Sequence, residues 1–119
     1  MSPANADPEN TVSLMFGGDV MLGRTVNKRI AQHGVTYPLG AVAGLMRAAD
    51  LTIVNLECAI TGLAADAGNI WPGTPKAFYF GASAQAVHTL QDAGVDMVSL
   101  ANNHVLDFEI GRASCRERV

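Results

Sequence analysis

Three short polar clusters in the 119-residue sequence contain side chains of the types that bind metal ions or transfer protons. They are residues 17–19 (GGD), 55–57 (NLE) and 102–104 (NNH). Two carboxylates, several amide oxygens and one imidazole form a mixed oxygen and nitrogen ligand set that suits a divalent cation. Taken singly, each cluster also has a simpler explanation: a helix-capping Asp19, a solvated Glu57 at a strand end, and a turn held by asparagine side chains.

Each polar cluster comes at the end of a short apolar segment. The segments are 12–16, 51–57 and 95–101, and their near-continuous apolarity is typical of strands buried on both faces of a parallel sheet. Ligands of open α/β sheets bind outside the carboxyl ends of the strands, so we expect the polar side chains to converge there. The converging residues are Asp19, Asn55, Glu57, Asn102, Asn103 and His104.

Helical patterns separate the three expected strands, with apolar residues recurring every three or four positions. The helical segments are 22–34, 39–50 and 83–94. In the first, the apolar stripe is Leu22, Val26 and Ile30, and in the third it is Ala84, Val87 and Leu90. Gly34 is expected to end the first helix and Ser83 to cap the third.

The order of these segments predicts the fold class. Strands alternate with helices, which is typical of α/β proteins with parallel strands and crossover helices. A long Gly- and Pro-rich segment, 61–82, is expected to be a loop that finishes in a short aromatic strand. Long loops in compact domains tend to be functional, and Trp71 and Tyr79 of this segment are candidates for contact with substrate or for packing.

Composition excludes several classes of protein. The chain is 49% hydrophobic and 16% charged, which is typical of a soluble globular domain. A net charge of −3, with no basic cluster outside the C-terminal tail, argues against a nucleic-acid-binding protein. No apolar run reaches the ~18 residues that a membrane span requires. Residues 1–10 are polar, with no signal-peptide pattern, and predict a disordered lead-in and a cytoplasmic location for the chain as written.

The C-terminal tail differs in character from the rest of the chain. Residues 110–119 are encoded without mismatch by one reading frame of a common short-read sequencing adapter, and the preceding bases also complete the codon for Glu109. We therefore expect the native sequence to stop at Phe108 and 109–119 to be read-through. On this hypothesis the source locus continues past Phe108 with a different sequence, and a disulfide between Cys58 and Cys115 has no meaning.

Three segments carry a resemblance to a known family. FGGDVMLGR (16–24), ADLTIVNLECAIT (49–61) and AGVDMVSLANNHVLDF (93–108) together resemble the CapA capsule-synthesis family. Its members belong to poly-γ-glutamate capsule systems, are often attached at the cell surface, and share the calcineurin-like metallophosphoesterase fold. The resemblance implies that 11–108 is the N-terminal part of such a layered domain, truncated here.

The resemblance also implies roles for individual residues. Asp19 is similar to the metal ligand of the first strand, Glu57 stands where the bridging carboxylate would be, and Asn103 resembles the metal-binding amide. His104 resembles the imidazole that faces the substrate phosphate, and Asp107 could orient it by a hydrogen bond. The implied cofactors are divalent ions (Mn, Fe, Zn or Mg), two in the full-length parent, which would hold a phosphoryl group and activate a water molecule.

Two departures from the family pattern limit this transfer. The family's first motif is Asp-x-His, and here Met21 replaces the histidine with a thioether suited to packing. The histidines that the family supplies later in its sequence are absent from this chain. We therefore expect the chain by itself to lack a full two-metal centre and to be inactive.

Several other residues are weaker candidates. Arg24, Asn55 and Asn102 are candidate substrate-binding residues. For Arg24 the reason is that a guanidinium pairs bidentately with phosphate or carboxylate. For Arg24 the alternative is an ordinary surface arginine. The simplest interpretations of the remaining candidates are structural, and these candidates are His33, His88 and Cys58.

Two classes of function remain open from the sequence. The first is a metal-dependent hydrolase of phosphoesters, or of a related bond in polymer metabolism. The second is a non-catalytic structural component of a capsule polymer synthesis or export assembly. The partners implied by the resemblance are an anionic polymer or phosphoester substrate and other capsule synthesis proteins.

Overall fold

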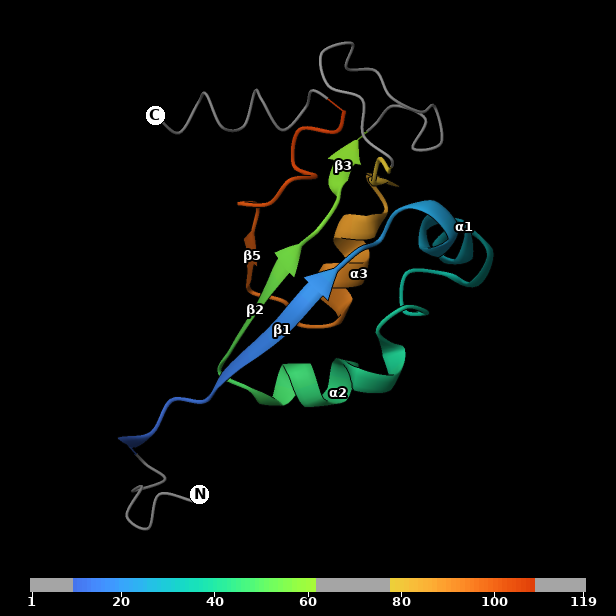
Figure 1. Ribbon diagram of the computed structural model, residues 1–119. Helices are drawn as coiled ribbons and strands as arrows, with labels where there is room; N and C mark the ends of the chain where they lie inside the picture. The colour runs from blue at the N-terminus through green and yellow to red at the C-terminus, as the bar shows by residue number, and fades with distance from the viewer. Residues whose placement is uncertain (1–9, 62–77, 109–119) are drawn as a thin grey trace.

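A computed structural model describes residues 10–61 and 78–108 of the protein (Figure 1). Most of the expected lead-in, Trp71 and the tail 109–119 lie outside the described residues. The elements in chain order are β1 (Leu14–Val20), α1 (Arg24–His33), α2 (Gly40–Ala48), β2 (Leu51–Leu56), β3 (Ala59–Thr61), β4 (Gly81–Ser83), α3 (Ala86–Asp92) and β5 (Met97–Ser99).

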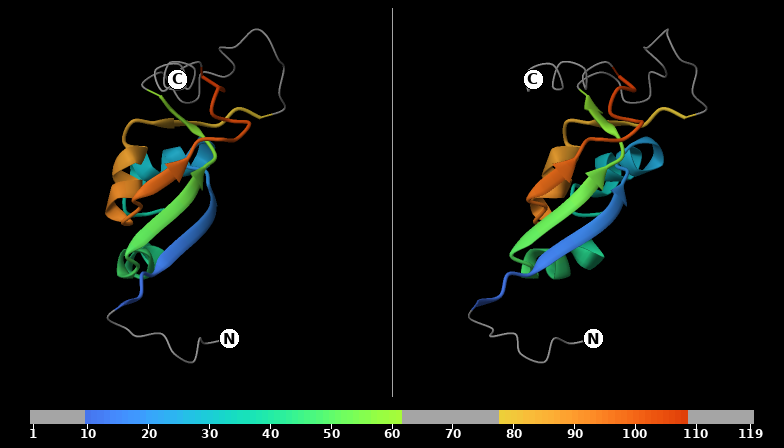
Figure 2. Two further views of the ribbon diagram at one scale, coloured as in Figure 1. Left: turned by 90° about the vertical axis from the view of Figure 1, so that its left-hand side faces the viewer. Right: turned by 60° about the vertical axis from the view of Figure 1, so that its left-hand side comes forward.

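The strands form two parallel sheets. The larger has the strand order β1-β2-β5, and the smaller pairs β3 with β4. The three helices of the described residues lie on one face of the larger sheet, as the turned views show (Figure 2). This arrangement confirms the predicted α/β class with parallel strands. No helix within 10–61 and 78–108 is long and apolar enough to cross a membrane.

The core lies between the larger sheet and the helices. Alternate residues of β2 are buried, and Val54 and Leu56 face the helices at 2% and 4% exposure. Leu22 and Ile30 are buried against them, with Val26 packed at the edge of the core, so the apolar stripe predicted for α1 is confirmed. Gly34 ends α1 at φ 93°, a left-handed conformation that favours glycine.

The first strand is longer than the sequence predicted. The Gly17-Gly18-Asp19 cluster was expected to follow the strand, but it lies inside β1, where a register shift between Phe16 and Asp19 interrupts the pairing with β2. Gly17 is needed because a Cβ there would lie 2.8 Å from Val54 Cγ1. Gly17 therefore allows β1 to approach β2 closely at the register shift.

The strands are not buried on both faces, contrary to the prediction. Phe16 of β1 is 70% exposed, and all three residues of β5 are exposed. In β1 the reason is that the described helices cover only one face of the sheet, so side chains that alternate to the other face stay open. In β5, which is an edge strand, side chains toward both faces are exposed.

Two local predictions near α3 were also wrong. Ser83 does not cap the helix: it lies in β4, and its backbone N–H donates to Asn27 Oδ1 at 2.9 Å. The buried residues of α3 are Ala86, Thr89 and Leu90, whereas Val87 is 39% exposed. The expected aromatic strand begins only at Gly81, directly after the aromatic residues.

Candidate functional site

The two carboxylates of the predicted site are joined by a single amide. Asp19 and Asn55 are register partners on β1 and β2, and Asn55 Nδ2 donates to Asp19 Oδ1 at 2.8 Å. The same nitrogen donates to Glu57 Oε2 at 2.6 Å. Glu57 is two residues beyond Asn55, so both side chains leave the same side of the extended chain. The strand ends therefore bring both carboxylates to one place, as predicted.

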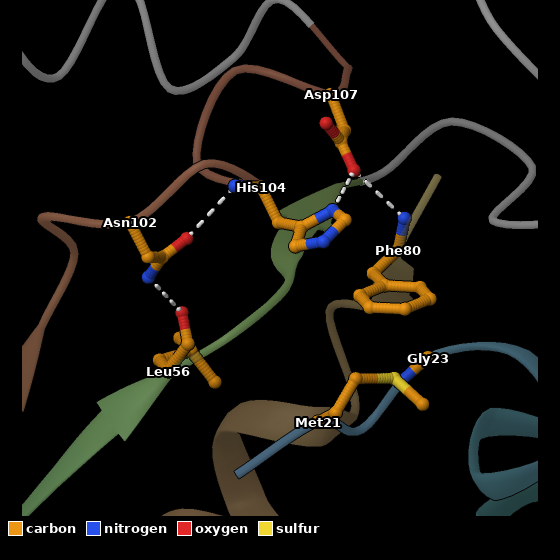
Figure 3. Close-up of polar contacts among 7 residues, drawn as sticks. All are labelled: Met21, Gly23, Leu56, Phe80, Asn102, His104 and Asp107. Atoms are coloured by element: carbon orange, nitrogen blue, oxygen red, sulfur yellow. Dashed lines mark hydrogen bonds and ion pairs between the residues drawn. The ribbon is translucent and has the colours of Figure 1, made fainter. Parts of the chain in front are cut away.

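Asn102 ties the loop after β5 to the end of β2. Its Nδ2 donates to Asn55 Oδ1 at 3.1 Å. The same nitrogen donates to the Leu56 carbonyl at 2.8 Å (Figure 3). Its Oδ1 accepts the His104 backbone N–H at 3.0 Å. With every polar atom of its amide occupied, Asn102 is a positioning group that sets His104 relative to the carboxylates. Asn103, the predicted metal-binding amide, lies exposed between these two residues.

His104 is held from two sides. Its Nδ1 lies 2.6 Å from Asp107 Oδ2, and its ring stacks on the Phe80 ring at 4.1 Å between centroids (Figure 3). The Asp107 oxygen also accepts the Phe80 backbone N–H at 2.9 Å. His104 and Asp107 are 8% and 2% exposed. Because a carboxylate acts as acceptor at Nδ1, that nitrogen carries the hydrogen, which leaves Nε2 to act on another group.

The segment that carries Phe80 is packed closely between two others, one at Gly23 and one at Phe108. A Cβ on Gly23 would lie 2.7 Å from the Gly81 carbonyl oxygen, and a Cβ on Gly81 would lie 2.6 Å from the Phe108 ring. Phe108 is itself 1% exposed. Sequence reasoning did not identify Phe80, Gly81 or Phe108 as part of the site. The only available signal was an aromatic run placed directly before a glycine.

Met21 has the packing role that its thioether suggested. It packs against the core, and its sulfur accepts the Gly23 backbone N–H at 3.0 Å (Figure 3). Met21, which occupies the place of the histidine in the Asp-x-His motif, therefore stabilises the connection between β1 and α1.

The remaining candidates lie outside the hydrogen-bonded cluster. The Arg24 guanidinium lies over the Phe78 ring, 5.2 Å from its centroid. His33 stacks on Tyr37 and His88 lies 3.1 Å from Gln91, so both have local partners.

Cys58 directly follows Glu57 but is not a nucleophile candidate. Its side chain is 1% exposed. Burial raises the pKa of the Cys58 thiol, and the nearby Glu57 charge adds to this, although a hydrogen bond with the Leu22 backbone opposes it. A buried, protonated thiol is unreactive, so the structural interpretation holds.

The described residues offer part of a ligand set for a metal ion. Within 10–61 and 78–108 no group of three or more His, Cys, Asp or Glu side chains is placed to hold one. Asp19 and Glu57 do form a pair of hard oxygen donors linked through Asn55, and divalent cations such as Mg²⁺ and Mn²⁺ prefer oxygen ligands. The donor chemistry fits such an ion, and further ligands would be needed to complete its coordination.

Comparison with known proteins identifies the family. Residues 13–113 match the family described as bacterial capsule synthesis protein PGA_cap. The chain is 25% identical over 108 residues to capsule biosynthesis protein CapA of Bacillus anthracis, a match that covers 91% of this chain and 26% of that protein. It is 26% identical over 102 residues to PGA biosynthesis protein CapA of Bacillus subtilis (strain 168), covering 86% of this chain and 26% of that protein. The chain thus spans about a quarter of these relatives' length, and it belongs to the bacterial capsule synthesis protein PGA_cap family.

Proposed function

We propose that this chain forms part of a divalent-metal centre in a longer capsule-biosynthesis protein that hydrolyses a phosphoester or a related bond of an anionic polymer. The observation that carries the proposal is the Asn55 amide, which holds Asp19 and Glu57 together at the strand ends. The two carboxylate charges held around one amide repel each other, although each accepts a hydrogen bond from that amide. A bound cation removes that repulsion.

The residues around the carboxylates have separate tasks in this mechanism. A divalent ion, when bound, supplies positive charge that stabilises a phosphoryl group and lowers the pKa of water. Asn55 orients both carboxylates, and Asn102 sets the distance between them and His104. Asp107 accepts the His104 Nδ1 hydrogen and so orients the ring. With a second hydrogen on Nε2, the ring can donate that proton to the leaving oxygen. The activity belongs to the longer protein, because this chain spans only about a quarter of its relatives' length.

The alternative is a non-catalytic component of a capsule polymer synthesis or export assembly. Met21 favours this alternative, because its side chain packs against the core at the position where the Asp-x-His motif supplies a histidine. In that case the carboxylate pair would hold at most one structural ion, and other capsule synthesis proteins would be the partners.

Metal binding tests the centre directly. We expect the 119-residue chain to bind Mn²⁺ in calorimetry, and Asp19→Asn or Glu57→Gln to weaken binding by about tenfold or more. Asp92→Asn is the matched control, because that carboxylate is exposed and lies on α3, away from the strand ends. Equal Mn²⁺ binding by all four proteins would remove the proposed centre.

Activity separates the two classes of function. In the longer protein, hydrolysis of a chromogenic phosphodiester with Mn²⁺ is expected, and His104→Ala should abolish it. Mn²⁺ binding without any hydrolysis would instead support the non-catalytic component.

A further inference from the structure

Arg24 has an unusual backbone conformation. Its φ is 51°, and among the described residues it is the only non-glycine residue with a positive φ. This left-handed region is unfavourable for a long side chain, and glycine or asparagine would occupy it at lower cost. The residue is also exposed, so its conformation is not explained by burial of the side chain.

Two contacts hold the start of α1 in this position. The Gly23 backbone lies against Gly81 so closely that a Cβ would come within 2.7 Å of the Gly81 carbonyl oxygen. One turn further along α1, Asn27 Oδ1 accepts the Ser83 backbone N–H at 2.9 Å. These contacts bind the first turn of α1 to β4, and they place Arg24 beside the aromatic residues that precede β4.

A row of stacked rings leads from Arg24 to His104. The Arg24 guanidinium lies 5.2 Å from the Phe78 ring centroid. Phe78 and Phe80 stack at 6.4 Å, and Phe80 stacks on His104 at 4.1 Å. Phe78 is 56% exposed and Arg24 is also exposed, so this stacked pair is open to solvent. A guanidinium that lies over a ring keeps the N–H groups on its edge available to an anion.

We propose that Arg24, positioned by Phe78, binds an oxyanion of the substrate, either a carboxylate or a phosphate group. The guanidinium can present two parallel N–H donors to such a group, and the Phe78 ring beneath it fixes where it lies. The inference rests on the proposed function in one respect, which is that His104 acts on an anionic molecule.

The first experiment measures anion binding without metal. In chelator-treated buffer, the Nε–Hε signal of Arg24 in the ¹⁵N-labelled 119-residue chain is followed during titration with inorganic phosphate and, separately, with glutarate. A shift of this signal with either anion supports the proposal, and the two titrations tell a phosphate group from a carboxylate. No shift with either anion would overturn it.

Variants show whether the guanidinium carries the binding. Arg24→Gln is expected to weaken binding by about tenfold, and Arg24→Lys by a smaller factor, because lysine keeps the charge without the planar pair of donors. Arg29→Gln is the matched control: it removes an exposed arginine of the same helix whose guanidinium hydrogen-bonds Gln32. Equal losses in Arg24→Gln and Arg29→Gln would show only a general charge effect and would contradict the proposal.

A third variant separates binding from folding. Arg24→Gly relieves the positive φ, so its urea midpoint should equal or exceed that of the unmodified chain, while anion binding falls as in Arg24→Gln. Anion binding that survives in Arg24→Gly would overturn the proposal. The two proposals fail in different experiments. The metal centre is tested by Mn²⁺ binding to Asp19 and Glu57, whereas the anion titration contains no metal.

Discussion

Asp107 joins two segments of the site, because it contacts both His104 and the Phe80 backbone. One of its oxygens lies 2.6 Å from His104 Nδ1 and accepts the Phe80 backbone N–H at 2.9 Å. The sequence suggested the pairing with His104, and the structure contains that contact. The link to Phe80 was not foreseen, since Phe80 is 27 residues away along the chain.

Replacing this carboxylate should destabilise the fold. Asp107→Asn removes a charged acceptor from a buried position, and hydrogen bonds to charged groups contribute about 1.5–3 kcal/mol. We expect the free energy of unfolding, measured by urea denaturation, to fall by about that amount. Asp92→Asn, at an exposed site, should change it by less than about 1 kcal/mol. Similar small losses in both variants would show that the buried contact is not important for stability.

At the scale of elements, glycines decide how closely segments approach. Gly81→Ala in β4 would place a Cβ 2.6 Å from the buried Phe108 ring, and overpacking of this kind costs about 1–3 kcal/mol. Gly44→Ala is the matched control, because a Cβ at that position of α2 has nothing within 4 Å. Alanine there should stabilise the helix by about 0.5–1 kcal/mol. The two substitutions should therefore change the stability measured by thermal or urea unfolding in opposite directions. A change in the same direction would contradict the close packing of Gly81 against Phe108.

A second contact between elements fixes the start of the larger sheet. The backbone N–H and the hydroxyl of Ser13 both donate to Asp50 Oδ2 at 2.7 Å, and the Asp50 N–H donates back to Ser13 Oγ at 2.9 Å. The hydrogen bond from the Ser13 backbone, and then that from its side chain, lower the pKa of Asp50 below its usual 3.8.

This contact predicts a pH dependence. A lowered folded pKa means that the stabilisation is present above the unfolded pKa and is lost as the pH falls through the folded value. Asp50→Asn should therefore lower the urea midpoint at neutral pH and reduce its further decline in acid. Urea unfolding at neutral pH and at about pH 3 provides the comparison. If the urea midpoint of Asp50→Asn fell in acid as much as that of the unmodified chain, the loss of stability would have to come from other carboxylates.

At the scale of the whole molecule, the main feature is the face of the larger sheet that none of the described helices covers. Phe16, Ile53 and Met97 are register neighbours across β1, β2 and β5, and Phe16 and Met97 are 70% and 54% exposed. Leu14 extends this apolar row at 53% exposure. Contiguous apolar surface of this kind promotes association.

The chain by itself should therefore self-associate through this face. Phe16→Thr together with Met97→Thr keeps good strand formers and removes the apolar contact, so the variant should shift toward monomer in light scattering. Leu45→Thr is the control, because Leu45 is similarly exposed at 66% but lies on α2. If Leu45→Thr reduced association as much as the double variant did, the sheet face would not be the contact.

The candidate site was largely predictable because its main signals are local. Apolar runs identified the strand positions, and parallel pairing alone brings their carboxyl ends to one edge, so Asp19, Asn55, Glu57 and Asn102 could be expected to meet. The apolar stripe of α1 was predictable for the same reason, since a helical period is a property of neighbouring residues.

What the sequence by itself determined is thus the α/β class, the family resemblance and the polar edge of the sheet. Only the tertiary structure decided that Gly17 and Gly18 lie within a strand, that Ser83 pairs with Asn27 instead of capping a helix, and that Phe80 lies on His104. Each of these outcomes depends on contacts between residues far apart in the chain. Local propensity assigns a glycine pair to a turn and a serine to a cap, and it gives way where packing against another segment offers a larger gain.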